Sequence, residues 1–129
     1  RFWWHRVLML DKEWRFLAQS FPDDAWVRYN VGLWMLNDER YENAVLYLRA
    51  AIDSQQLPIE VRGVAYKKLG LALVGVGNMT EAEQSFLAAL EQSPPDDQAY
   101  CSLPEVYKQM GMVNEAAQAG KNCRKFSSK

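Results

Sequence analysis

The stretch NMTEA, residues Asn78–Ala82, indicates the fold, because the chain contains this phrase three times in varied form. The other two copies are RYENA, Arg40–Ala44, and MVNEA, Met112–Ala116. Their final alanines are separated by steps of 38 and 34 residues along the chain. Self-similarity at such a period is typical of architectures built from one repeated supersecondary unit.

Small residues accompany each copy of the phrase at constant distances. Gly32 and Gly70 lie twelve residues before the first two final alanines, and Pro104 occupies the same place in the third copy. Ala51 and Ala89 lie seven residues after those first two alanines. Two helices approach each other closely only where the residues at their crossing are small. The pattern therefore predicts helical hairpins that cross at these residues.

The phased small residues resemble those of the tetratricopeptide repeat family, whose unit is a helix–turn–helix of about 34 residues. The resemblance covers essentially the whole chain and implies an all-α fold, a right-handed α-solenoid in one domain, 1–129. We expect seven helices, at about 2–21, 24–37, 41–54, 58–76, 79–93, 97–110 and 113–126. The expected repeats are an N-terminal helix at 1–24 and full repeats at 25–58, 59–96 and 97–129.

A second echo concerns the start of the chain. The stretch FLAQSFPDD, Phe16–Asp24, nearly repeats ALEQSPPDD, Ala89–Asp97, and the repeat register aligns Pro22 with Pro94. The residues before Pro22 are therefore expected to form the second helix of a repeat whose first helix is missing. We accordingly expect the chain to be part of a longer protein. The paired aspartates are predicted to cap the helices that follow them.

Three local departures from the repeat carry predictions of their own. Pro58, beside four extra residues, predicts one added turn at the start of its helix, where proline is tolerated. Pro104 predicts a kink or a late helix start, with the capping-box pattern SLPE beginning at Ser102. Cys101 and Cys123 lack metal-type spacing and are predicted to be buried small apolar residues rather than a disulfide.

Composition and motifs argue against several functions. The chain is 49% hydrophobic and 24% charged with a net charge of −1, so no global field attracts nucleic acid or anionic lipid. Its apolar runs are too short for membrane insertion. The single histidine is His5, and no nucleotide, metal or nucleophile motif accompanies it. We expect no catalysis, cofactor or metal; the compartment stays open, with the cytoplasm slightly favoured.

The resemblance implies a concave groove, lined by the first helix of each repeat, that binds a protein or peptide partner. The lysines and aromatic residues favour a partner with acidic and apolar character. Trp26 and Tyr29 could equally pack against the N-terminal helix. Some family members clamp C-terminal carboxylates; Asn30 and Lys68 match that clamp, but Val64 stands where it needs lysine. The predicted groove residues are Trp26, Tyr29, Asn30, Leu33, Lys67, Lys68, Leu71, Glu105 and Lys108.

A second surface is predicted on the N-terminal helix. Phe2, Met9 and Phe16 recur every seven residues, which places them along one side of a helix. An uncovered apolar stripe of this kind usually marks a contact with another molecule. The alternative function is therefore a self-associating structural protein that dimerises through this helix.

Overall fold

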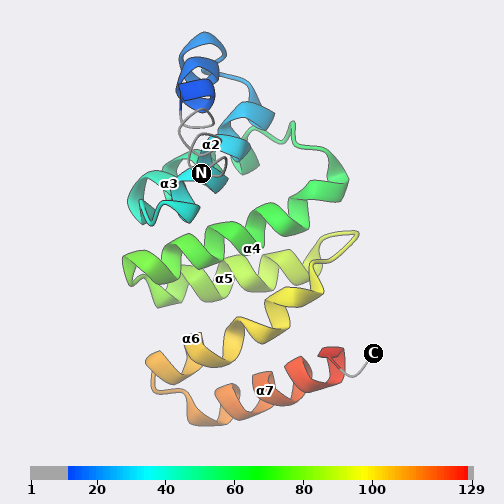
Figure 1. Cartoon of the computed structure of the whole chain (residues 1–129). Coiled ribbons are helices and arrows are strands. Elements are labelled where there is room, and N and C mark those ends of the chain that lie inside the picture. The colour runs from blue at the N-terminus through cyan, green and yellow to red at the C-terminus, as the bar shows by residue number, and fades with distance from the viewer. Residues whose placement is uncertain (1–11, 128–129) are drawn as a thin grey trace, which may run out of the picture. The chain divides into compact units, whose positions relative to one another are not determined.

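The computed structural model describes residues 12–127 of the chain, and every regular element in that range is helical (Figure 1). This confirms the predicted all-α class. The chain divides into two compact units, which meet at the Leu57–Pro58 bond. No helix within residues 12–127 is both long and apolar enough to cross a membrane.

The first unit contains a helical stretch at 12–20, followed by the hairpin of α2 (Ala25–Asn37) and α3 (Tyr41–Asp53). The two helices pack closely because α2 has a glycine, Gly32, at the point where it crosses α3. A Cβ atom added to Gly32 would lie only 2.7 Å from Cγ of Leu48, which is fully buried. The close approach that the small residue predicted is therefore present.

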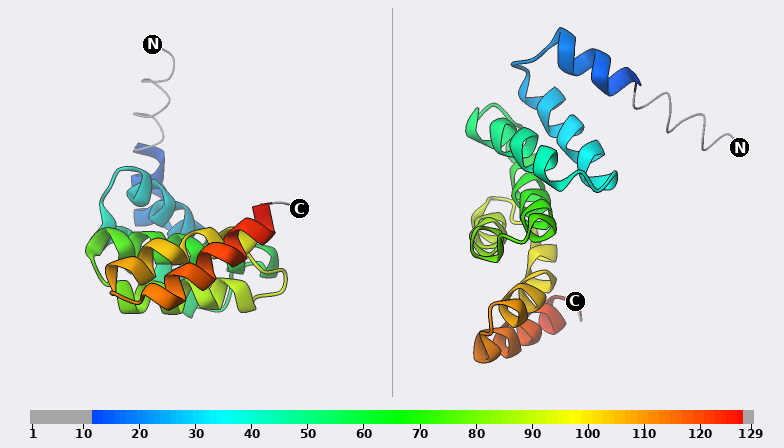
Figure 2. Two further views of the ribbon diagram at one scale, coloured as in Figure 1. Left: turned by 90° about the horizontal axis from the view of Figure 1, so that it is seen from below. Right: turned by 90° about the vertical axis from the view of Figure 1, so that its left-hand side faces the viewer.

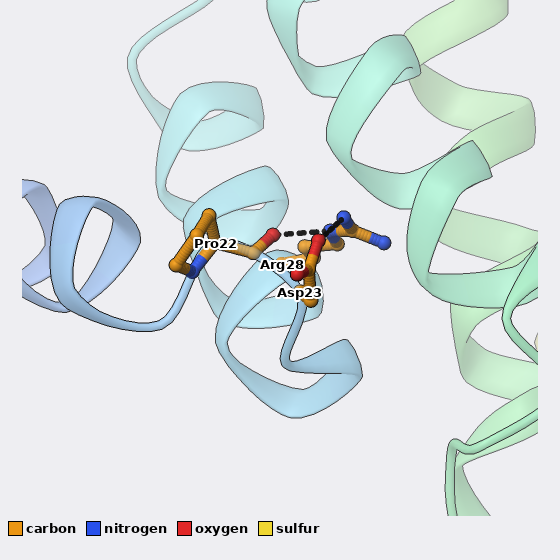
Figure 3. A network of polar contacts seen from close by, with 3 residues as sticks. All are labelled: Pro22, Asp23 and Arg28. Atoms are coloured by element: carbon orange, nitrogen blue, oxygen red, sulfur yellow. Dashed lines mark hydrogen bonds and ion pairs between the residues drawn. The ribbon is translucent and has the colours of Figure 1, made fainter.

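The turn before α2 is fastened by side chains. Asp24 caps the helix, since its Oδ1 accepts a hydrogen bond from the Val27 amide at 2.9 Å. Figure 3 shows Arg28 reaching back across the turn, where its guanidinium donates to the Pro22 carbonyl at 2.8 Å and to Asp23 at 3.1 Å. The predicted capping role of the first aspartate pair is thus confirmed for Asp24.

The second unit begins with the hairpin of α4 (Ile59–Val76) and α5 (Met79–Glu91), which lie side by side in Figures 1 and 2. The helix α4 has 18 residues against 13 in α2, so the predicted extra turn is confirmed, with Pro58 at the N-cap. At the crossing, a Cβ atom on Gly70 would lie 2.6 Å from the ring of Phe86. Gly77 ends α4 at φ 91°, in the left-handed conformation that favours glycine.

The third hairpin differs from the other two because its first helix is broken. A 3₁₀-helix, η1 (Asp97–Cys101), is followed by α6 (Leu103–Gln109) and then by α7 (Val113–Ser127). The break at Ser102 confirms the interruption predicted from Pro104. The predicted capping box is wrong, because Ser102 makes no side-chain cap hydrogen bond. Its backbone is already helical, at φ −89° and ψ −24°, whereas capping residues are normally extended.

The prediction for the two cysteines is also wrong. Cys101 of η1 and Cys123 of α7 form a disulfide, with their Cα atoms 4.6 Å apart. Cys101 is exposed and Cys123 is half-buried, so neither is a buried apolar residue. The separation of 22 positions along the sequence gave no indication of the bond, because the fold of the hairpin brings the two cysteines together.

The core of each unit consists of the predicted small residues and the large side chains between them. All three final alanines of the repeated phrase are buried, as are the two alanines seven residues further along the chain. Among residues 12–127, the apolar residues with no exposed surface are Ala44, Leu48, Ala51, Ala65, Ala72, Ala82, Phe86, Ala89 and Ala99.

Candidate partner-binding faces

The surface of α2 carries the first candidate site, the α2 face, which consists of Trp26, Asn30 and Leu33. These residues are three or four positions apart and therefore share one side of the helix. Trp26 is 49% exposed, and the centroid of its ring lies 5.5 Å from that of Tyr29. Tyr29 itself is only 6% exposed, so it belongs to the core and supports the tryptophan.

The Asn30 side chain also contacts the backbone of Trp26. The Asn30 side-chain amide donates a hydrogen bond to the Trp26 carbonyl at 2.9 Å. This bond fixes the Asn30 side chain against the helix backbone, whereas the Trp26 ring is restrained by its contact with the ring of Tyr29. Three of the four residues predicted on α2 thus reach the surface, while Tyr29 lies beneath them.

Lys67 of α4 does not present a free charge. Its ammonium donates a hydrogen bond to Oε1 of Gln98 and lies 3.4 Å from Oδ2 of Asp96. The Lys67 and Asp96 side chains are only 12% and 8% exposed. Both partners of Lys67 were missed in the sequence prediction. Asp96 caps η1, and Gln98 lies in its first turn. Lys67 therefore fastens α4 to the turn that leads into η1.

Asp96 is the centre of this turn. Its Oδ1 accepts the Gln98 amide at 3.0 Å, which confirms the capping role predicted for the second aspartate pair. Its Oδ2 has no hydrogen-bond partner among the described residues, so the ion pair with Lys67 compensates its charge. The chain is tight here, because a Cβ atom on Gly63 would lie 3.0 Å from the Asp96 nitrogen.

The remaining predicted residues of the second unit form two pairs. Lys68 and Leu71 are half-buried and lie one turn apart on α4, so they share one side of that helix. Glu105 and Lys108 are exposed and lie one turn apart on α6. The Glu105 carboxylate accepts a hydrogen bond from Gln109 at 3.3 Å. Among the predicted groove residues of this unit, Lys68 and Lys108 are therefore the cations that could attract an acidic partner.

Two hollows were not predicted from the sequence. An open cleft of about 730 Å³ is lined by residues of η1 and of the C-terminal part of α7, namely Asp97, Tyr100, Asn122, Lys125, Phe126 and Ser127. A smaller hollow of about 140 Å³ in the first unit is lined by Trp14, Arg15, Ala18, Gln19, Val31, Trp34, Met35 and Tyr47. Within residues 12–127, no group of histidine, cysteine or acidic residues could hold a metal ion.

The predicted self-association stripe is described only at Phe16, which is 65% exposed. Phe2, Met9 and the single histidine, His5, lie outside the described residues.

Tyr107 of α6 connects the last two hairpins electrostatically. Partial burial raises the pKa of its hydroxyl, and so do the hydrogen bond that it donates to Glu83 and the negative charges of Glu83 and Glu115. Together these effects raise the pKa of Tyr107 from 10.0 to about 12. The two glutamates belong to α5 and α7, so the pKa of Tyr107 depends on charges of both helices that neighbour α6.

The raised pKa predicts a pH dependence of stability. The folded chain holds the Tyr107 proton more tightly than the unfolded chain does, so its contribution is complete below pH 10 and disappears as the pH rises from 10 to 12. Glu83→Gln should lower the pKa of Tyr107 toward its ordinary value. Ultraviolet titration of tyrosinate, with Tyr107→Phe to identify the band, measures this. An unchanged late titration in Glu83→Gln would contradict the assignment.

Comparisons with known proteins support the repeat assignment. Residues 63–96 match the family model described as tetratricopeptide repeat, in the register set by Gly70 and Ala82. No curated protein matches the chain in sequence. Tetratricopeptide-repeat proteins act in general as scaffolds for protein–protein interaction and are generally non-catalytic.

Solved structures of similar fold extend the likeness beyond the matched repeat. MamA from MSR-1 has a TM-score of 0.83 and 24% identity, over 95% of this chain and 68% of that one. MamA from AMB-1 has a TM-score of 0.78 and 25% identity, over 91% of this chain and 68% of that one. PilF of Pseudomonas aeruginosa has a TM-score of 0.73 and 23% identity, and 89% of this chain covers 51% of it. Residues 63–96 therefore match a tetratricopeptide repeat, and the chain as a whole has the fold of tetratricopeptide-repeat proteins.

Proposed function

We propose that the chain is a non-catalytic scaffold that binds a protein partner chiefly through the α2 face. The observation that carries the proposal is the 49% exposure of Trp26, whose ring contacts the ring of the buried Tyr29. Tryptophan is among the residues that most often dominate the energy of an interface, particularly where packing holds it in place. Leu33 adds apolar surface two turns further along the helix, and Asn30 adds a polar edge.

The partner proposed for this face is a peptide segment, extended or helical, that places an apolar side chain against Trp26. Lys68 and Lys108 are left out of this site, because they belong to the second unit. Lys67 is left out of the proposed site, because Asp96 and Gln98 already occupy its ammonium.

Selection of a displayed random peptide library on the chain tests the proposal, followed by titration calorimetry of the enriched peptides. Trp26→Ala should weaken binding about 30-fold or more, as expected for the loss of a dominant interface residue. Leu46→Ala is the matched control, because Leu46 is also an exposed apolar residue of the first unit but lies on α3. Undiminished binding to Trp26→Ala would place the site elsewhere.

A second candidate function is self-association through the helix that includes residues 12–20. The observation that favours it is the 65% exposure of Phe16, a large apolar side chain. Light scattering across a concentration range should show a dimer that Phe16→Glu converts to a monomer. Leu46→Glu, at an equally exposed position, should leave the dimer intact. A wild-type chain that stays monomeric at every concentration would rule this function out.

A further inference from the structure

We propose that the disulfide between Cys101 and Cys123 is a redox-operated lock that holds η1 to the C-terminal half of α7. Opening of this bond by a dithiol reductant would release both segments, while the hairpin of α4 and α5 stays folded. Cys101 is exposed, so a reductant in solution can reach the bond without prior unfolding. Exposed disulfides are more often labile or regulatory than buried ones.

The C-terminal half of α7 has little packing to hold it in place. The buried residues of α7 are Ala116 and Ala119, and both lie in its first half. From Gly120 to Ser127 every side chain is exposed or half-buried. The cleft of about 730 Å³ lies along this half, lined on one side by η1 and on the other by α7. Where apolar contact is this sparse, the covalent bond becomes the main restraint.

The helix η1, which lines the other side of the cleft, has weak backbone hydrogen bonding of its own. The helix η1 has only five residues and is of the 3₁₀ type, whose hydrogen bonds have poorer geometry than those of an α-helix. Pro104 prevents η1 from continuing into α6 as one regular helix. Three restraints hold η1 to its neighbours: the buried side chain of Ala99, the contacts of Asp96 and Gln98 with Lys67, and the disulfide to α7.

The proposed chemistry is thiol–disulfide exchange. A thiolate of the dithiol attacks one sulfur of the Cys101–Cys123 bond and forms a mixed disulfide, which displaces the other cysteine as a thiolate. The second thiol of the reductant then displaces the first cysteine. Two electrons and two protons pass to the protein, which ends with two thiols, and the reductant ends as a cyclic disulfide.

Hydrogen exchange measured by mass spectrometry on the full chain tests the proposal, before and after treatment with dithiothreitol. Reduction should accelerate exchange at least about 10-fold in residues 97–101 and 120–127 and leave α5 unchanged. Loss of a cross-link that closes a loop of this size should also lower the melting temperature by about 10 °C. Reoxidation with glutathione disulfide should restore both values. Thiol labelling that finds both cysteines free after oxidation, or exchange that reduction leaves unchanged, would overturn the proposal.

The matched control is the double variant Cys101→Ser/Cys123→Ser. It should exchange like the reduced wild-type chain and should not respond to dithiothreitol. A variant that still responded would show that the effect of the reductant arises elsewhere and would contradict the lock. If the variant does not fold, the comparison of oxidised and reduced wild-type chain still decides between the two outcomes.

Discussion

Gly70→Val should destabilise the second unit by about 3 kcal/mol or more, because the crossing of α4 and α5 has no room for a side chain. Even the first added carbon would lie 2.6 to 2.8 Å from three atoms of the Phe86 ring. The ring cannot move aside easily, since it is fully buried. Urea denaturation followed by circular dichroism measures the change as a lower midpoint at an unchanged slope.

Gly120→Ala is the matched control for this prediction, because Gly120 also lies inside a helix of the same unit. A Cβ atom there would meet only the Arg124 guanidinium, at an ordinary 3.6 Å. Alanine should therefore stabilise the chain by about 0.5–1 kcal/mol, since it restricts the unfolded chain and favours the helix. Equal midpoints for Gly70→Val and wild type would contradict the close crossing.

Lys67→Met should destabilise the second unit by about 2–4 kcal/mol, because it leaves the Asp96 carboxylate buried without a compensating charge. Oδ2 of Asp96 has no hydrogen bond to replace the lost ion pair. Methionine keeps most of the apolar stem of lysine, so the change chiefly removes charge. Urea denaturation is again the measurement. Lys68→Met, one residue further along α4, should alter stability by no more than about 0.5 kcal/mol.

A second substitution separates the charge of Asp96 from its capping role. Lys67→Met/Asp96→Asn should recover most of the lost stability, because asparagine is neutral yet still accepts the hydrogen bond from the Gln98 amide. If the double variant is as unstable as Lys67→Met alone, the cost does not come from an uncompensated carboxylate. Equal losses from Lys67→Met and Lys68→Met would contradict the special role of Lys67.

The candidate site was partly predictable from the sequence. The register placed Trp26, Asn30 and Leu33 on one side of a first helix, because helical periodicity alone determines which residues share a side. The same register placed Tyr29 beside them, but the structure buries Tyr29. Helical periodicity does not show which residues on one side of a helix are covered by other parts of the protein. The exposure of each residue therefore depended on tertiary packing.

The sequence by itself determined the helices, their order and the crossings at Gly32 and Gly70, since local periodicity and small residues act within one hairpin. Only the tertiary structure decided that Asp96 and Gln98 engage Lys67 and that Cys101 bonds to Cys123. Each of these contacts joins side chains that lie 22 to 31 residues apart in the sequence. Which side chains meet depends on how neighbouring helices pack and on where their side chains point. The spacing of residues within one helix carries no information about that packing.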